Sequence, residues 1–264
     1  MTYSTLASIV KYPYPSTMAG KKNKFGFFKS EEPVYLNIAE ELGISRHSDG
    51  RWCRHPLVYL VEAADDICYE IMDIEDAHKL GILTTDETKE LLIRFVPSDK
   101  HSHMEDVMAQ VADRNEKVAY LRSSAIGILE NACVDVFVSN EDKILEGSFE
   151  GSLIKNLPED IRNAYSTCSE VSYDRIYRNK NVVDIELAGY KIISQLIDLF
   201  VGAAMEPDKA YSKLLLSRVS SQYKVDAASP YDRLMAVVDF ISGMTDVFAL
   251  DLYRKINGES LPMI

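Results

Sequence analysis

The stretch "HPLVYLVEAADDICYEIMDIEDAHKLG", residues 55–81, decides the fold of this chain more clearly than any other part of its sequence. Its apolar residues recur every three or four positions from Leu57 to Ile74, which is the spacing of one face of an α-helix. Pro56 is typical of a helix start, and Gly81 is typical of a helix end. The pattern therefore predicts a helix from residue 56 to residue 79.

This predicted helix is unusually rich in carboxylates, and two of them share a line with a tyrosine. Asp65, Tyr69 and Asp73 are spaced i, i+4, i+8, so each is turned only ~40° around the helix axis from the one before. A carboxylate on a buried face needs a metal, a cation or hydrogen-bond donors. The alternative is that Asp65 and Asp66 lie on a solvated face and pair with Lys or Arg. The residues alone leave both interpretations open.

Helical periodicity also dominates the rest of the chain after about residue 33, and no series of alternating strands is visible. Thr84 and Glu87 have the spacing of a capping box. The sequence predicts an all-α protein, with one short hairpin near residues 20–30. The other predicted helical segments are 33–43, one very long helix from about 104 to 140, 182–203, 209–223 and 229–256.

Composition narrows the class of function. The net charge of −12 argues against broad binding to nucleic acid or to an acidic membrane surface. Four scattered cysteines form no C-x-x-C pair, which favours a reducing cytoplasm. We expect no membrane span, because no apolar run approaches ~18 residues, and no signal peptide. The motifs of Walker-type ATPases, serine hydrolases and Rossmann enzymes are missing.

Residues 11–29 form a lysine-rich interval with no acidic residue and with five aromatic residues. This composition is typical of a loop that meets an anion, although a solvated basic loop balancing an acidic body explains it equally well. The five histidines make no metal-binding pattern. His101 and His103 are predicted to lie in a polar link, and His55 at a helix entrance.

Beyond these patterns, the sequence resembles a known family. The segment "RHPLVYLVEAADDICYEIMDIEDAHKLGIL" is similar to the part of the dGTPase-like deoxynucleoside triphosphate triphosphohydrolases that carries the last metal-binding aspartate of their HD-type site. Further similar segments follow the family's order, and the resemblance covers nearly the whole chain. It implies a multi-helix, HD-domain-like bundle. These segments are "MTYSTLASIVKYPY", "KFGFFKSE", "YLRSSAIGILENACVDVFVSNEDKILEGSFEGSLI", "VVDIELAGYKII" and "DFISGMTDVFALDLYRKI".

The resemblance implies roles for the three residues of the acidic line. Asp65, the first Asp of "EAADD", corresponds to the metal ligand. Tyr69 corresponds to the residue that packs on the deoxyribose, and Asp73 to the one that accepts a hydrogen bond from its 3′-hydroxyl. The i, i+4, i+8 spacing agrees with these roles.

The resemblance also implies the other contacts to the nucleotide. Lys11 and Tyr12 of "VKYP" and Lys24 of "KFGFF" correspond to residues that contact the triphosphate, which suits an ammonium group. Tyr177 and Glu186 correspond to positions at the base-side end of the pocket.

One departure from the family concerns the N-terminal part. Family members are longer and carry there a histidine and a His-Asp pair, whereas no His-Asp dipeptide occurs in these 264 residues. We therefore expect a C-terminal portion: a fragment, a separately encoded half or a truncated relative. It is expected to be one all-α unit, 1–264, with a nucleotide-contacting loop region, 1–32, and a helical body, 33–264. The general acid and base are expected in the N-terminal half, so this chain contributes no catalytic residue and is inactive alone.

The resemblance thus implies an enzyme that removes intact triphosphate from dGTP or another dNTP. It implies a divalent metal, Mg²⁺ or Mn²⁺ or another transition metal, together with an N-terminal HD-containing polypeptide or segment. It also implies a homo-oligomer. We expect no membrane partner, and we do not expect nucleic acid as a partner except as a regulator. A non-catalytic nucleotide-binding or assembly module is the main alternative, and a helical interaction protein with a solvated acidic line is the second.

Overall fold

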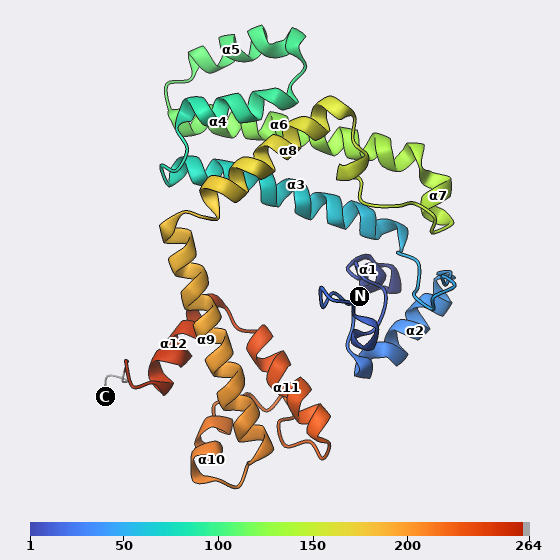
Figure 1. Ribbon diagram of the computed structural model, residues 1–264, viewed down its shortest axis with the longest axis vertical. Coiled ribbons are helices and arrows are strands. Elements are labelled where there is room, and N and C mark those ends of the chain that lie inside the picture. The colour runs from blue at the N-terminus through green and yellow to red at the C-terminus, as the bar shows by residue number, and fades with distance from the viewer. Residues whose placement is uncertain (261–264) are drawn as a thin grey trace. The chain divides into compact units, whose positions relative to one another are not determined.

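The computed structural model describes residues 1–260, and within them it contains twelve α-helices and no strand (Figure 1). The predicted all-α class is confirmed. The chain divides into two compact units, Met1–Arg178 and Asn179–Ile264, where the sequence predicted a single unit. The physical reason is that the apolar residues after residue 179 pack mainly on one another and form a hydrophobic core of their own.

Unit 1 is organised around a pair of long helices, α3 (Pro56–Lys79) and α6 (Arg114–Ser139), which pack against each other. His55 caps α3 by accepting a hydrogen bond from the Leu57 amide, and Gly81 ends the helix at a φ of 70°. The bounds predicted for α3 are thereby confirmed. The remaining α-helices of unit 1 are α1 (Tyr3–Ser8), α2 (Glu32–Glu41), α4 (Thr85–Leu92), α5 (His101–Gln110), α7 (Glu141–Leu145) and α8 (Glu159–Val171).

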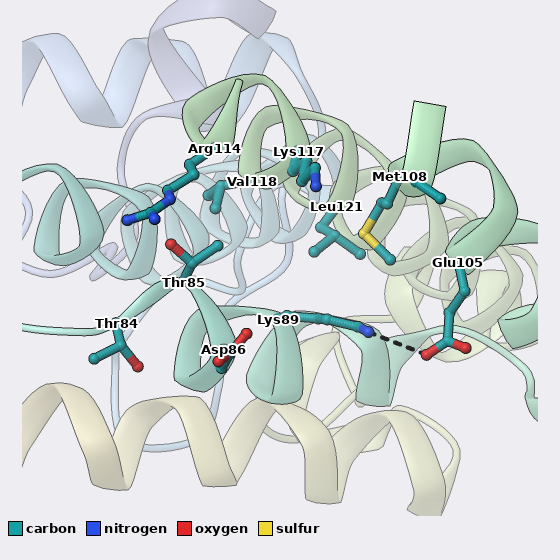
Figure 2. Close-up of a pocket in the computed structure, with 11 residues that line it drawn as sticks. Thr84, Thr85, Asp86, Lys89, Glu105, Met108, Arg114, Lys117, Val118 and Leu121 are labelled. Atoms are coloured by element: carbon teal, nitrogen blue, oxygen red, sulfur yellow. Dashed lines mark hydrogen bonds and ion pairs between the residues drawn. The ribbon is translucent and has the colours of Figure 1, made fainter. Parts of the chain in front are cut away.

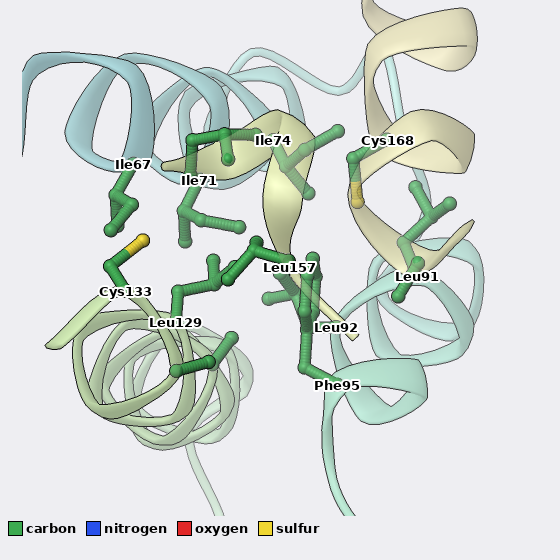
Figure 3. Close-up of a cluster of buried hydrophobic side chains, with 14 of the residues drawn as sticks. Ile67, Ile71, Ile74, Leu91, Leu92, Phe95, Leu129, Cys133, Leu157 and Cys168 are labelled. Carbon is green, nitrogen blue, oxygen red and sulfur yellow. The ribbon is translucent and has the colours of Figure 1, made fainter. Parts of the chain in front are cut away.

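The core of unit 1 explains which side of α3 is left open. Ile67, Ile71 and Ile74 recur at the i, i+4, i+7 spacing and point from α3 toward Leu129 of α6 and Leu92 of α4 (Figure 3). All five side chains are almost fully buried. Because this face is committed to the core, residues a half-turn away lie on the opposite, exposed side of the helix.

Unit 2 is built on α9 (Lys180–Met205), which packs against α10 (Ala210–Leu216), α11 (Pro230–Ser242) and α12 (Asp246–Ile256). Its core includes Leu196 and Phe200 of α9 with Val237 and Phe240 of α11. Two predicted helices are shorter than expected. The segment predicted at 209–223 ends its helix at Leu216, and the one predicted at 229–256 is interrupted at 243–245, where Thr245 caps α12.

The prediction that no apolar run reaches the length of a membrane span is wrong for α9. By length and composition alone, Lys180–Met205 is long and apolar enough to cross a membrane. Its C-terminal half buries Leu196, Phe200, Ala203 and Ala204 in the core of unit 2. The same apolar composition is typical of a helix that packs in a protein core.

The prediction of a single long helix from residue 104 onward is also wrong, because residues 111–113 are not helical and separate α5 from α6. Asp113 has an extended backbone and accepts hydrogen bonds from the Asn115 and Glu116 amides, so it caps a new helix. His101 and His103, predicted in a polar link, instead begin α5. The helices α1 and α8 were not predicted at all.

The short hairpin expected near residues 20–30 is not present. This segment pairs with an earlier one: the Gly26 amide donates to the Tyr14 carbonyl, and the Ser16 amide donates to the Phe27 carbonyl. Asn23 turns the chain at a φ of 51°. Phe27 stacks on Tyr35 of α2 with ring centroids 4.6 Å apart, so burial of this aromatic side chain holds the loop in place of cross-strand pairing.

Candidate functional site

The exposed side of α3 carries the predicted metal ligand and the predicted sugar contact. Asp65 is exposed, and its carboxylate makes no ion pair or hydrogen bond with the described residues 1–260. Tyr69, one turn further, keeps 61% of its surface exposed. Apolar residues are exposed on the same helix, including Leu57 and Val61 at 41% and 43%. This side of α3 is therefore open in the described part of the chain.

Tyr177, although distant in the sequence, contacts Asp73 and Tyr69 on α3. Its hydroxyl donates a hydrogen bond of 2.6 Å to Asp73 Oδ2, 104 residues earlier. Its ring lies 6.3 Å from that of Tyr69. Burial first, and then the Asp73 hydrogen bond, raise the pKa of Tyr177, so its phenol stays protonated and remains a donor. Three of the predicted site residues, Tyr69, Asp73 and Tyr177, thus form one contiguous group.

A second attachment to α3 holds the segment that leads into Tyr177. The residues Ser172–Ile176 form a π-helical turn after α8. Glu70, only 6% exposed, accepts hydrogen bonds from the Ser169 hydroxyl at 2.6 Å and the Ser172 hydroxyl at 2.8 Å. A buried carboxylate with these donors anchors the turn to α3, and π turns of this kind recur at functional sites. The sequence carries no signal of this burial, because the two serines lie about a hundred residues away.

Lys11 and Tyr12 lie beside the N-terminal half of the same helix, in a cavity of about 1120 Å³. The Lys11 ammonium lies 3.0 Å from Glu62 Oε1, and the Glu62 side chain is only 9% exposed. Glu62 and Asp66 of α3 line this cavity together with Lys155. The structure therefore brings two of the three predicted phosphate contacts, Lys11 and Tyr12, to α3, one turn before Asp65.

Arg54 connects the segments around this cavity, and sequence analysis did not identify it. Its guanidinium donates to Glu62 Oε2 at 3.0 Å, to the Lys11 carbonyl at 3.1 Å and to the Gly151 carbonyl at 3.3 Å. It also lies over the Tyr59 ring, 5.5 Å from the centroid. The sequence offered only a weak signal, a basic residue directly before a helix entrance.

The charges around Glu62 influence one another. Burial lowers the pKa of Lys11, but the hydrogen bond and charge of Glu62, with the charge of Asp66, outweigh it and raise that pKa. Burial raises the pKa of Asp66; the charge of Lys11 opposes this change, whereas Glu62 and Asp65 add to it. Two cations, Lys11 and Arg54, thus share the single carboxylate of Glu62.

The other two predicted substrate contacts are Lys24 and Glu186. Lys24 is exposed, and its side chain has no hydrogen bond or ion pair with residues 1–260. Glu186 is an exposed residue of α9 in unit 2. Both assignments stay predictions.

Metal-binding side chains do not converge in the part of the chain that the structure describes. Within residues 1–260, no group of three or more His, Cys, Asp and Glu side chains is arranged to hold a metal ion. His55 caps α3, which confirms its place at a helix entrance, and burial lowers its pKa. A lone carboxylate such as Asp65 does not make a metal site, which needs four to six ligands.

Comparison with known proteins gives three consistent similarities. Residues 156–255 match a family model described as a phosphohydrolase-associated domain. Nearly the whole chain, 99%, is 34% identical to a deoxyguanosinetriphosphate triphosphohydrolase-like protein of Pseudomonas aeruginosa, of which it covers 61%. It is 31% identical to a protein of that name from Synechocystis, with 99% of the chain and 60% of the relative covered.

A more distant relative carries the full enzyme name. The chain is 25% identical to a deoxyguanosinetriphosphate triphosphohydrolase of Yersinia enterocolitica, with 97% of the chain and 60% of the relative covered. The chain thus spans about three-fifths of the length of the curated relatives that it matches.

Proposed function

Because this chain belongs to the dGTPase-like family of HD-type phosphohydrolases, we propose that it forms one wall of a site that hydrolyses a deoxynucleoside triphosphate to the deoxynucleoside and triphosphate. The chain supplies contacts to sugar and phosphate and one metal ligand. The remaining ligands and the general acid and base belong to an N-terminal HD-containing segment or partner. Cytoplasmic location and homo-oligomer formation remain predictions of the same resemblance.

The observation that carries the proposal is the cluster of Tyr69, Asp73 and Tyr177 on the open side of α3, one turn from the free carboxylate of Asp65. Two aromatic rings beside an oriented carboxylate are suited to a sugar, which offers an apolar face and hydroxyl groups.

Asp73 is oriented for hydrogen bonding by Tyr177. The phenol occupies Oδ2, and Oδ1 has no partner among the described residues. A carboxylate held by one oxygen still accepts with the other, and a charged acceptor strengthens the bond. We assign Oδ1 to the 3′-hydroxyl of the deoxyribose.

Tyr69 accounts for the choice of deoxyribose over ribose. In this proposal its exposed ring packs on the C2′ side of the sugar, where a ribose hydroxyl would clash and lose its hydration. Replacing Tyr69 with Ala should therefore raise the relative rate with GTP over dGTP, because the space beside C2′ opens.

The triphosphate is assigned to the cavity beside Glu62. Lys11 and Arg54 both pair with the Glu62 carboxylate in the lining of this cavity, and Tyr12 lies next to them. An incoming polyphosphate competes with Glu62 for the Lys11 ammonium, whereas Arg54 keeps its carbonyl hydrogen bonds and holds the loop in place.

Asp65 is assigned as the metal ligand that this chain contributes. Mg²⁺ or Mn²⁺ suits a carboxylate ligand, and the metal, when bound, activates water and neutralises phosphoryl charge. Residues 1–260 hold no group of three or more ligating side chains, so the chain alone does not fit the metal.

The decisive experiment uses the chain together with the N-terminal HD segment and measures triphosphate release from dGTP with Mn²⁺ or Mg²⁺. Asp65→Ala should abolish release. The matched control is Asp76→Ala, an exposed aspartate on the same helix that pairs only with Lys79, and it should keep activity near wild type. Metal-dependent release by Asp65→Ala would contradict the assigned role.

The alternative function is a non-catalytic nucleotide-binding or assembly module. It predicts that dGTP stabilises the assembled protein, that Asp73→Asn weakens this effect, and that no triphosphate appears with any metal. Absence of both binding and hydrolysis in the complete assembly would refute the site itself.

A further inference from the structure

A second cavity lies outside the site described above, between α4, α5 and the first turns of α6 in unit 1 (Figure 2). Its volume is about 520 Å³, which is the size of pockets that hold small organic molecules. None of the residues to which the family resemblance assigns a role lines it. It therefore needs an explanation of its own.

The floor of this cavity is apolar. Met108 of α5 and Val118 and Leu121 of α6 line it, and all three belong to the hydrophobic core of unit 1. Figure 2 shows the Met108 thioether and the Leu121 side chain between Lys117 and Lys89. A thioether adapts to ligands of different shape, so this floor suits an apolar or aromatic body.

The rim of the cavity is polar, and its charged side chains differ in whether they already have an ionic partner. Lys89 is paired with Glu105 at 3.0 Å. Arg114 and Lys117 have no side-chain hydrogen bond or ion pair with the described residues 1–260, and Asp86 has none either. The charged lining residues without a partner are thus two cations and one anion, in a chain whose net charge is −12.

The two free cations stand where a helix least favours them. Arg114 and Lys117 belong to the first turn of α6, a helix of 26 residues, and the N-terminus of a helix is its positive end. Asp113, the nearby N-cap, already accepts from two backbone amides. Glu116 of the same turn and Asp113 are negatively charged, but within residues 1–260 neither forms an ion pair with Arg114 or Lys117, so both cations are available to a bound anion.

We propose that the cavity between α4, α5 and α6 binds a small organic carboxylate, with its apolar body on Met108 and Leu121 and its carboxylate on Arg114 and Lys117. The single net positive charge of the free rim matches a monoanion. A guanidinium pairs with a planar carboxylate through two parallel hydrogen bonds, which favours a carboxylate over a spherical ion.

The test is a titration of the full chain, labelled at its methionine methyl groups, with 2-naphthoate. The Met108 methyl resonance should shift with saturation. Two probes represent the separate parts of the ligand: acetate has the charge without the body, and 2-naphthol has the body without the charge. Each should bind at least about tenfold more weakly, because each lacks one of the two contacts.

The variant Arg114→Gln/Lys117→Gln should weaken 2-naphthoate binding by at least about tenfold, which is the effect of losing one bidentate charged contact. Lys21→Gln/Lys22→Gln removes two exposed lysines elsewhere and should leave the affinity unchanged. The methyl resonances outside the cavity show that each variant is folded. A Met108 resonance that stays unmoved, responds equally to 2-naphthol, or responds equally in the Arg114 and Lys117 variant would overturn the proposal.

Discussion

Replacing Arg54 with Ala should destabilise unit 1 by about 2–3 kcal/mol. The guanidinium donates to the Glu62 carboxylate and to two main-chain carbonyls, and its side chain is only 24% exposed. Breaking a buried charge pair costs ~3–5 kcal/mol, and each lost neutral hydrogen bond ~1 kcal/mol. The total is smaller here, because Lys11 remains beside Glu62 and partial exposure screens the charges.

Trp52 makes this prediction measurable. It is the only tryptophan in the chain and lies in unit 1, so its fluorescence during urea unfolding follows that unit alone. Arg54→Lys keeps the charge but loses the planar fork of donors, so it should recover about half of the lost free energy. The midpoint in urea should fall for Arg54→Ala without a change in the dependence on urea concentration.

Arg51→Ala is the matched control. Arg51 is 43% exposed, forms a 3.5 Å pair with Asp49 and lies over the Tyr14 ring. Contacts of this exposed kind contribute at most ~1 kcal/mol. The reasoning would be refuted by an Arg54→Ala variant whose free energy of unfolding lies within ~0.5 kcal/mol of wild type, or by an equal loss in Arg51→Ala.

Two further predictions concern the fold and its pH dependence. Gly147→Ala should lower the free energy of unfolding by about 2–4 kcal/mol, because φ is 75° and a new Cβ would lie 2.7 Å from Cys53 Cβ. Gly43→Ala is the control: φ is 63° but the space is open, so it should cost only ~1–2 kcal/mol. Equal losses for the two variants in urea unfolding would contradict this prediction. Arg175 and the capping hydrogen bonds lower the pKa of Glu87 from 4.5 to about 2. Stability from this depressed pKa is present above pH 4.5 and disappears as pH falls toward 2. An NMR titration of the Glu87 carboxyl should show a midpoint that rises in Arg175→Gln, and an unchanged midpoint would refute the pairing.

Elements specified by local chemistry could be predicted from the sequence. The bounds of α3 follow from Pro56, Gly81 and the periodicity between them, and the Thr84 and Glu87 capping box is present as predicted. A break in a long apolar pattern was harder to see. Asp113 caps α6 inside a segment that otherwise keeps helical spacing, and the periodicity on both sides concealed the interruption.

The candidate site divides in the same way. That Asp65, Tyr69 and Asp73 lie along one side of a helix was determined by the sequence itself, because i, i+4, i+8 spacing places residues on neighbouring turns whatever surrounds them. The partners of these residues could not be predicted in this way. Only tertiary packing decided that Tyr177 meets Asp73, since the two residues are 104 positions apart and the sequence between them does not indicate where the chain returns.

The same packing decided which carboxylates of α3 are exposed. Nothing in the sequence identifies the partners of Glu70 and Glu62, yet Glu70 is buried on two serine hydroxyls and Glu62 is shared by Lys11 and Arg54. The sequence alone determined the helix and the direction of each side chain around it. The tertiary structure determined which of those directions meets another segment, because burial and hydrogen bonding depend on partners that are distant in the chain.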